Sequence, residues 1–111
     1  MKNINEILRH YLFAALWTEE LDDRDISDFS EDSIIEAKSD IEKFVAEAGN
    51  LLDGIKEDMI GHDFWLTRNG HGAGFWDRDL GEIGDKLTKI CEGYATKNVF
   101  GDNPKWEITI D

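Results

Sequence analysis

The sequence predicts an α+β fold in which three helices pack on a small antiparallel sheet, in the order ααββαββ. Apolar residues recur at helical spacing in three segments, and a glycine-rich stretch flanked by two Phe-Trp pairs lies between the second and the third. Residues 105–110 alternate between polar and apolar, which is typical of a strand. With 111 residues, of which 41% are hydrophobic, the chain fits one domain over residues 1–111.

The first helix is predicted from about residue 4 to Thr18, with Asn3 and Glu6 as a capping pair. Phe13 and Trp17 lie off its apolar stripe, four residues apart. Either a second element covers them, or they face a partner, for which a homodimer seam is one alternative.

The second helix is predicted to begin after Asp28 or Ser30 and to end near residues 53–54. One face is apolar, and the opposite face carries acids at helical spacing. The sequence therefore predicts a row of carboxylates on its solvent side: Asp32, Glu36, Asp40 and Glu47.

Residues 61–78 are predicted to form a β-hairpin around Asn69-Gly70, because two short apolar runs flank a turn sequence with further glycines. Neighbouring residues of a strand point to opposite faces, so one aromatic of each Phe-Trp pair is exposed or covered by a helix. If exposed together, these aromatics form a protein-binding patch bordered by arginines. The candidate binding residues of this segment are Trp65, Arg68, Asn69, His71, Trp76 and Arg78.

A third helix is predicted to open with a capping box from Asp79 to Glu82, and Cys91 is then a core residue. Val99-Phe100, a turn at 101–104 and a strand at 105–110 complete the predicted sheet.

The net charge of −13 is concentrated in one half of the chain. Residues 19–58 contain fifteen acids and four bases, which accounts for −11 of the total, whereas residues 61–111 hold the hairpin, the third helix and the C-terminal strands. An acidic surface repels phosphate backbones, so direct binding of duplex nucleic acid is not expected. A basic protein partner would be attracted.

Several classes of protein are disfavoured by the cysteine content and the hydropathy of the sequence. The single cysteine excludes an internal disulfide, and no zinc-binding motif is present. No signal peptide and no run of eighteen apolar residues appears, so we expect a cytoplasmic protein without membrane contact. We expect no cofactor and no metal.

The stretch His62-Asp63-Phe64-Trp65-Leu66-Thr67-Arg68-Asn69-Gly70-His71-Gly72-Ala73-Gly74-Phe75-Trp76-Asp77 resembles a family of small phage and prophage proteins. The run from Leu80 to Leu87 and Ala14-Ala15-Leu16-Trp17 share the resemblance, which covers most of the chain. It implies expression in the cytoplasm of an infected bacterial host and implies no mechanism.

A catalytic or ligand site in the same segment is the alternative. His62, Asp63, His71 and Asp77 are of metal-ligand type, but their spacing matches no known metal motif. The three alternating glycines lack the Lys-Ser/Thr of a phosphate loop, and no activated nucleophile is evident. Stacking of a nucleotide or single strand on Trp65 or Trp76 remains open.

We therefore expect a non-enzymatic, acidic, phage-type interaction protein that modulates or inhibits a host protein with a basic, nucleic-acid-handling surface. Rows of carboxylates could imitate the phosphates of DNA. The alternative is small-molecule, nucleotide or metal binding at segment 61–78.

Overall fold

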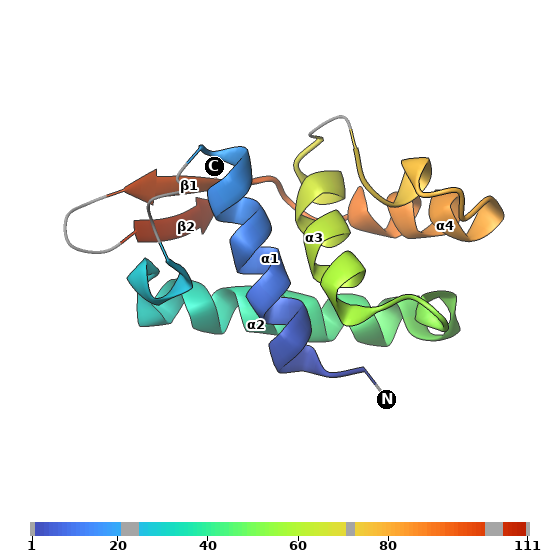
Figure 1. The fold of residues 1–111 in the computed structure, drawn as a ribbon, viewed down its shortest axis with the longest axis horizontal. Coiled ribbons are helices and arrows are strands. Elements are labelled where there is room, and N and C mark those ends of the chain that lie inside the picture. Colours follow the sequence, from blue (N-terminus) through green and yellow to red (C-terminus); the bar gives the residue numbers. More distant parts are fainter. Residues whose placement is uncertain (1, 21–24, 71–72, 102–105, 111) are drawn as a thin grey trace.

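The computed structural model describes residues 2–20, 25–70, 73–101 and 106–110, and in them the chain forms four α-helices. These are α1 (Ile4–Thr18), α2 (Glu31–Ala48), α3 (Glu57–Arg68) and α4 (Glu82–Cys91), with 3-10 turns at Ile26–Asp28, Gly49–Leu52 and Phe75–Asp77. The short strands β1 (Lys97–Gly101) and β2 (Trp106–Ile110) pair in antiparallel fashion at one end of the molecule (Figure 1). The predicted α+β class is therefore wrong, because the fold is all-α and its core lies between helices.

The first two helices begin where the sequence predicts. The Asn3 side chain accepts the Glu6 N–H at 3.1 Å and caps α1, and the Ser30 hydroxyl accepts the Ser33 N–H at 3.1 Å and caps α2. The α-helical part of α2 ends at Ala48 and continues as a 3-10 turn to Leu52, with Asp53 as the C-terminal cap and Gly54 at φ of 81°. The predicted end of this helical stretch near residues 53–54 is therefore confirmed.

The predicted hairpin at residues 61–78 is wrong. Its first half belongs to α3, and Phe75–Asp77 form a 3-10 turn. Asn69-Gly70 ends the helix: Gly70 has φ of 66°, the left-handed conformation that commonly terminates helices. The same dipeptide favours hairpin turns, which explains the misassignment.

Helix α3 lies at the centre of the core. The Phe64 ring stacks on Phe44 of α2 with centroids 4.3 Å apart. Trp65 meets Tyr11 of α1 edge to face at 5.3 Å and donates its indole N–H to the Thr18 hydroxyl at 2.8 Å. Burial on two sides leaves α3 little of the polar face that makes an amphipathic helix recognisable.

Helices α1 and α3 lie side by side (Figure 1), and their backbones are in close contact at Gly61. A Cβ atom at this position would lie 2.2 Å from the Ile7 carbonyl oxygen and 2.8 Å from the Tyr11 nitrogen, both in the backbone of α1. Glycine is therefore required by the close helix contact.

The last helix begins later than predicted. Gly81 is its N-terminal cap, and the expected capping box at Asp79 is not formed, since no side chain caps this helix. Cys91 is fully buried, as predicted, and burial raises the pKa of its thiol to about 12. The predicted turn at 101–104 falls mostly outside the described residues. No helix in the described ranges is both long and apolar enough to cross a membrane.

Replacing Gly61 by alanine tests the helix contact. At an exposed helix position Gly→Ala stabilises by about 1 kcal/mol, but here the added methyl group overlaps the α1 backbone. We expect the free energy of unfolding, measured by urea denaturation, to fall by about 1 to 3 kcal/mol. Glu42→Ala, an exposed change on α2, should stay within about 0.5 kcal/mol of wild type. A Gly61→Ala variant more stable than wild type would contradict the close backbone contact between α1 and α3.

Candidate functional site

Most of the predicted carboxylate row on α2 is engaged inside the molecule. Asp32 is exposed at the start of the helix. The other three acids pair with side chains from distant parts of the chain: Glu36 with Lys97, Asp40 with Arg68 at 2.9 Å, and Glu47 with the Tyr94 hydroxyl at 3.2 Å. This part of α2 therefore contacts α3 and the C-terminal segment, and its acids are less available to a partner than the sequence indicates.

Arg68 is a buried structural residue. Its guanidinium donates to the Tyr11 hydroxyl at 3.2 Å and to the Ala95 carbonyl at 3.0 and 2.6 Å, besides the Asp40 pair. It also lies 5.3 Å from the centre of the Phe64 ring. The predicted role of Arg68 at the border of an exposed patch does not fit this burial.

Asn69 and Arg78 also form contacts within the fold. The Asn69 side chain accepts the Lys97 N–H at 2.7 Å and donates to the Trp65 carbonyl at 3.0 Å. Arg78 binds the fully buried Asp63 with three hydrogen bonds of 2.8 to 3.2 Å, and this carboxylate raises the pKa of the guanidinium.

The two aromatic pairs are mostly core residues. Phe64, Trp65 and Phe75 are buried, and Trp76 is 51% exposed. A cross-strand patch with one exposed aromatic from each pair therefore does not form, because Trp76 is the exposed member of the four. His71 lies outside the described residues.

Two of the candidate metal ligands, Asp63 and Asp77, form hydrogen bonds to other groups of the protein. Asp63 holds Arg78, and Asp77 accepts the Gly74 N–H at 3.0 Å. Within the described ranges, no three His, Cys, Asp or Glu side chains gather around a point that could hold a metal ion.

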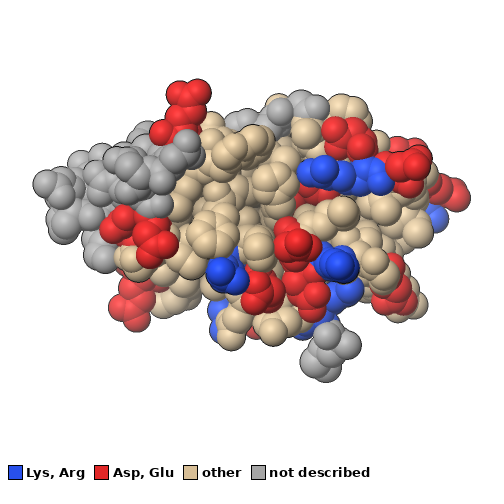
Figure 2. All heavy atoms as spheres, in the orientation of Figure 1, with Lys and Arg blue, Asp and Glu red and all other residues tan. Residues whose placement is uncertain are grey.

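Two exposed aromatic side chains that contact other aromatic rings lie instead on α1. Trp17 is 60% exposed and Phe13 37% exposed. The Trp17 ring lies 5.5 Å from the imidazole of His62 on α3, and His10 lies 5.9 Å from Phe13. We refer to His10, Phe13, Trp17 and His62 as the α1–α3 face. Figure 2 shows residues other than Asp, Glu, Lys and Arg gathered over these helices, bordered by both acidic and basic groups.

The surroundings of the α1–α3 face favour positive charge. Glu19 and Glu20 are exposed two and three residues after Trp17, just beyond the end of α1. The last turn of α1 carries no basic residue, so no side chain of that turn offsets the negative end of the helix dipole. Arg9 already places its guanidinium 5.3 Å from the centre of the Phe13 ring, which shows the contact that an external arginine would make.

His62 is the titratable group at the centre of this face. Its pKa is lowered, mainly because partial burial disfavours the charged imidazolium. Arg78 and His10 lower it further, and Asp63 and Asp58 oppose the shift.

Sequence reasoning had singled out Phe13 and Trp17 but not His10. The signal was present, because His10, Phe13 and Trp17 follow at spacings of three and four residues. His62 could not be assigned to the same face while residue 62 was expected in a strand.

No protein-family profile matches the chain, and no curated protein or solved structure is significantly similar to it. The resemblance to phage proteins therefore stays a prediction, and the site must be interpreted from its own geometry.

The lowered pKa of His62 makes stability depend on pH. Below pH 6.5 the unfolded chain binds a proton at His62 that the folded protein binds only at lower pH, so acidification favours unfolding. We expect wild type to lose more stability than His62→Gln between about pH 7 and about pH 5.5, measured by urea denaturation. An NMR titration of the imidazole should give a pKa below 6.5. An equal loss of stability in both proteins, or a pKa at or above the ordinary value, would contradict this.

Proposed function

We propose that the protein is a non-enzymatic interaction protein that binds a basic protein partner through the α1–α3 face. The observation that carries the proposal is the exposed Trp17 beside Glu19 and Glu20, on a chain with a net charge of −13. Exposed tryptophan is enriched among residues that dominate binding energy. A large negative charge accelerates encounter with a basic partner.

The contacts within the fold support arginine as the partner's main recognition element. A guanidinium can stack on the Trp17 indole and pair with the adjacent carboxylates, as Arg9 stacks on Phe13 and pairs with Glu6 at 3.1 Å. The negative end of the α1 dipole adds to the attraction. An aromatic centre with an acidic rim therefore suits an arginine-rich surface.

Basic, arginine-rich protein surfaces commonly bind nucleic acid, so the proposed partner is a nucleic-acid-handling protein. Under the predicted phage origin, this partner is a host protein whose basic surface is occupied. Glu36, Asp40 and Glu47 have internal partners, so imitation of DNA phosphates falls to other exposed acids, such as Asp32 and Glu42.

Capture of a partner from bacterial lysate, with mass spectrometry of the eluates, tests the proposal. Trp17→Ala should reduce capture by about tenfold or more, because it removes the aromatic centre of the interface. Ile35→Ala is the matched control, since Ile35 is 59% exposed but lies on α2. Both variants should keep the wild-type unfolding curve.

The charge arm uses a Glu19→Gln/Glu20→Gln variant. Its control is Glu82→Gln/Asp85→Asn, which removes the same charge from exposed positions of α4. The first should lose the captured protein, and duplex DNA added as competitor should release it from wild type. Equal retention by all variants, or a captured protein with an acidic surface, would contradict the proposal.

A further inference from the structure

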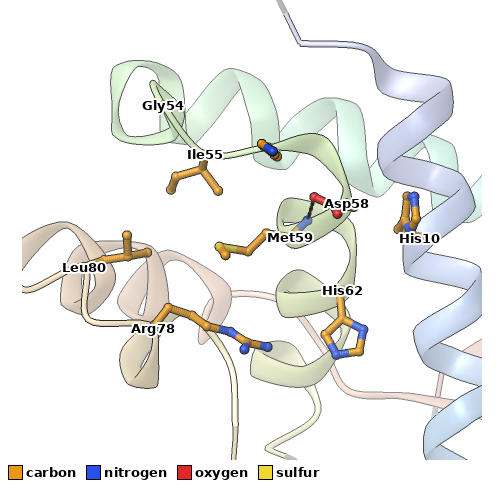
Figure 3. A pocket seen from close by; sticks show the side chains of 9 residues that line it. His10, Gly54, Ile55, Asp58, Met59, His62, Arg78 and Leu80 are labelled. Atoms are coloured by element: carbon orange, nitrogen blue, oxygen red, sulfur yellow. Dashed lines mark hydrogen bonds between the residues drawn. The ribbon is translucent and has the colours of Figure 1, made fainter.

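A hollow of about 630 Å³ lies beside the α1–α3 face, between α1, the start of α3 and the segment before α4 (Figure 3). This volume is within the range of small-molecule sites. Its apolar wall consists of Ile55, Met59 and Leu80.

The polar lining of the hollow is dominated by nitrogen groups. His10, Lys56, His62 and Arg78 line it, and they come from α1, from the N-terminal end of α3 and from the segment before α4. Lys56 is the residue before α3, so the positive end of that helix dipole also lies near the hollow, where Glu57 and Asp58 of the first turn offset part of it. Nitrogen donors over an apolar wall suit a ligand that combines a negative group with a hydrophobic part.

The Arg78 side chain is fixed in an orientation that can bind such a ligand. Its Nε and Nη2 atoms bind Asp63, which fixes the guanidinium plane. Among the described residues, none accepts a hydrogen bond from Nη1. Figure 3 shows this side chain reaching across the hollow toward His62. A donor fixed in advance loses little conformational entropy on binding.

One carboxylate, that of Asp58, belongs to the lining, and it accepts the Met59 N–H at 2.8 Å within its own helix. Its negative charge is therefore partly satisfied at the start of α3.

We infer that this hollow binds a small organic anion, namely a carboxylate or phosphate group carried on an apolar body. The negative group meets Arg78 Nη1, Lys56 and the His62 imidazole, and the apolar body packs on Ile55, Met59 and Leu80. This site shares His10 and His62 with the α1–α3 face. It goes beyond the proposed function, because its ligand is a small anion and it uses neither the exposed ring of Trp17 nor the acids Glu19 and Glu20.

Binding of an anion is coupled to protonation of His62. The imidazole is surrounded by Trp17 on α1 and by charged or titratable groups on each neighbouring element: Asp58, Asp63, His10 and Arg78. An anion in the hollow favours the imidazolium, so affinity rises as the pH falls toward 6.

NMR titration of the full-length labelled protein with four probes tests the site. Benzoate carries both features, acetate lacks the apolar body, inorganic phosphate supplies a different anion, and benzylammonium matches the size of benzoate with the opposite charge. Benzoate should shift the Met59 methyl and His62 imidazole signals to saturation. The dissociation constant from this titration should be smaller at lower pH. Acetate and phosphate should bind more weakly, and benzylammonium should not saturate.

Lys56→Gln removes one cation of the site without touching the core, since Lys56 is exposed. It should weaken benzoate binding by about two- to fivefold. Lys43→Gln, an equal change of charge at an exposed position of α2, should leave it unchanged. Equal binding of benzylammonium and benzoate, no saturable shift with benzoate, or equal affinity of Lys56→Gln and wild type would overturn the inference.

Discussion

The buried Arg68 guanidinium is the interaction on which the arrangement of the helices depends. It joins the Tyr11 hydroxyl of α1, the Asp40 carboxylate of α2 and the Ala95 carbonyl after α4, and it is itself part of α3. A buried cation is tolerated only where acceptors surround it, so these segments must come together at one point. The Arg68 contact with Tyr11 and the glycine at position 61 together allow the close packing of α1 on α3, on which the α1–α3 face depends.

The sequence predicts those parts of the fold that local patterns determine. Apolar spacing and capping residues identify α1 and the start of α2, and Cys91 is correctly placed in the core. Helix α3 is missed because Asn69-Gly70 suits both a hairpin turn and a helix end. In addition, a short helix buried on two sides has no clear polar face, so its Phe-Trp pair can be assigned equally to a strand.

For the functional surface too, local sequence patterns predict some features and miss others. Helical spacing correctly places the acids of α2 relative to one another, but their partners Lys97 and Arg68 are far away in the sequence, so local spacing does not reveal them. By contrast, the sequence shows that Trp17 lies off the apolar stripe of an amphipathic helix but leaves open whether a second element covers it or a partner does. The structure leaves Trp17 exposed. Most described residues of segment 61–78 form contacts within the fold, and only His62 of this segment joins Phe13 and Trp17 of α1 in the proposed interaction.

The free energy of unfolding of an Arg68→Met variant, from urea denaturation, tests most directly whether Arg68 holds the helices together. Methionine fills part of the volume but leaves the Asp40 carboxylate and the buried Tyr11 hydroxyl without their donor. We predict a loss of about 3 to 5 kcal/mol, as expected when one partner of a buried ion pair is removed. An Arg68→Met protein as stable as wild type that only fails to capture a partner would contradict this structural role and would make Arg68 a binding residue.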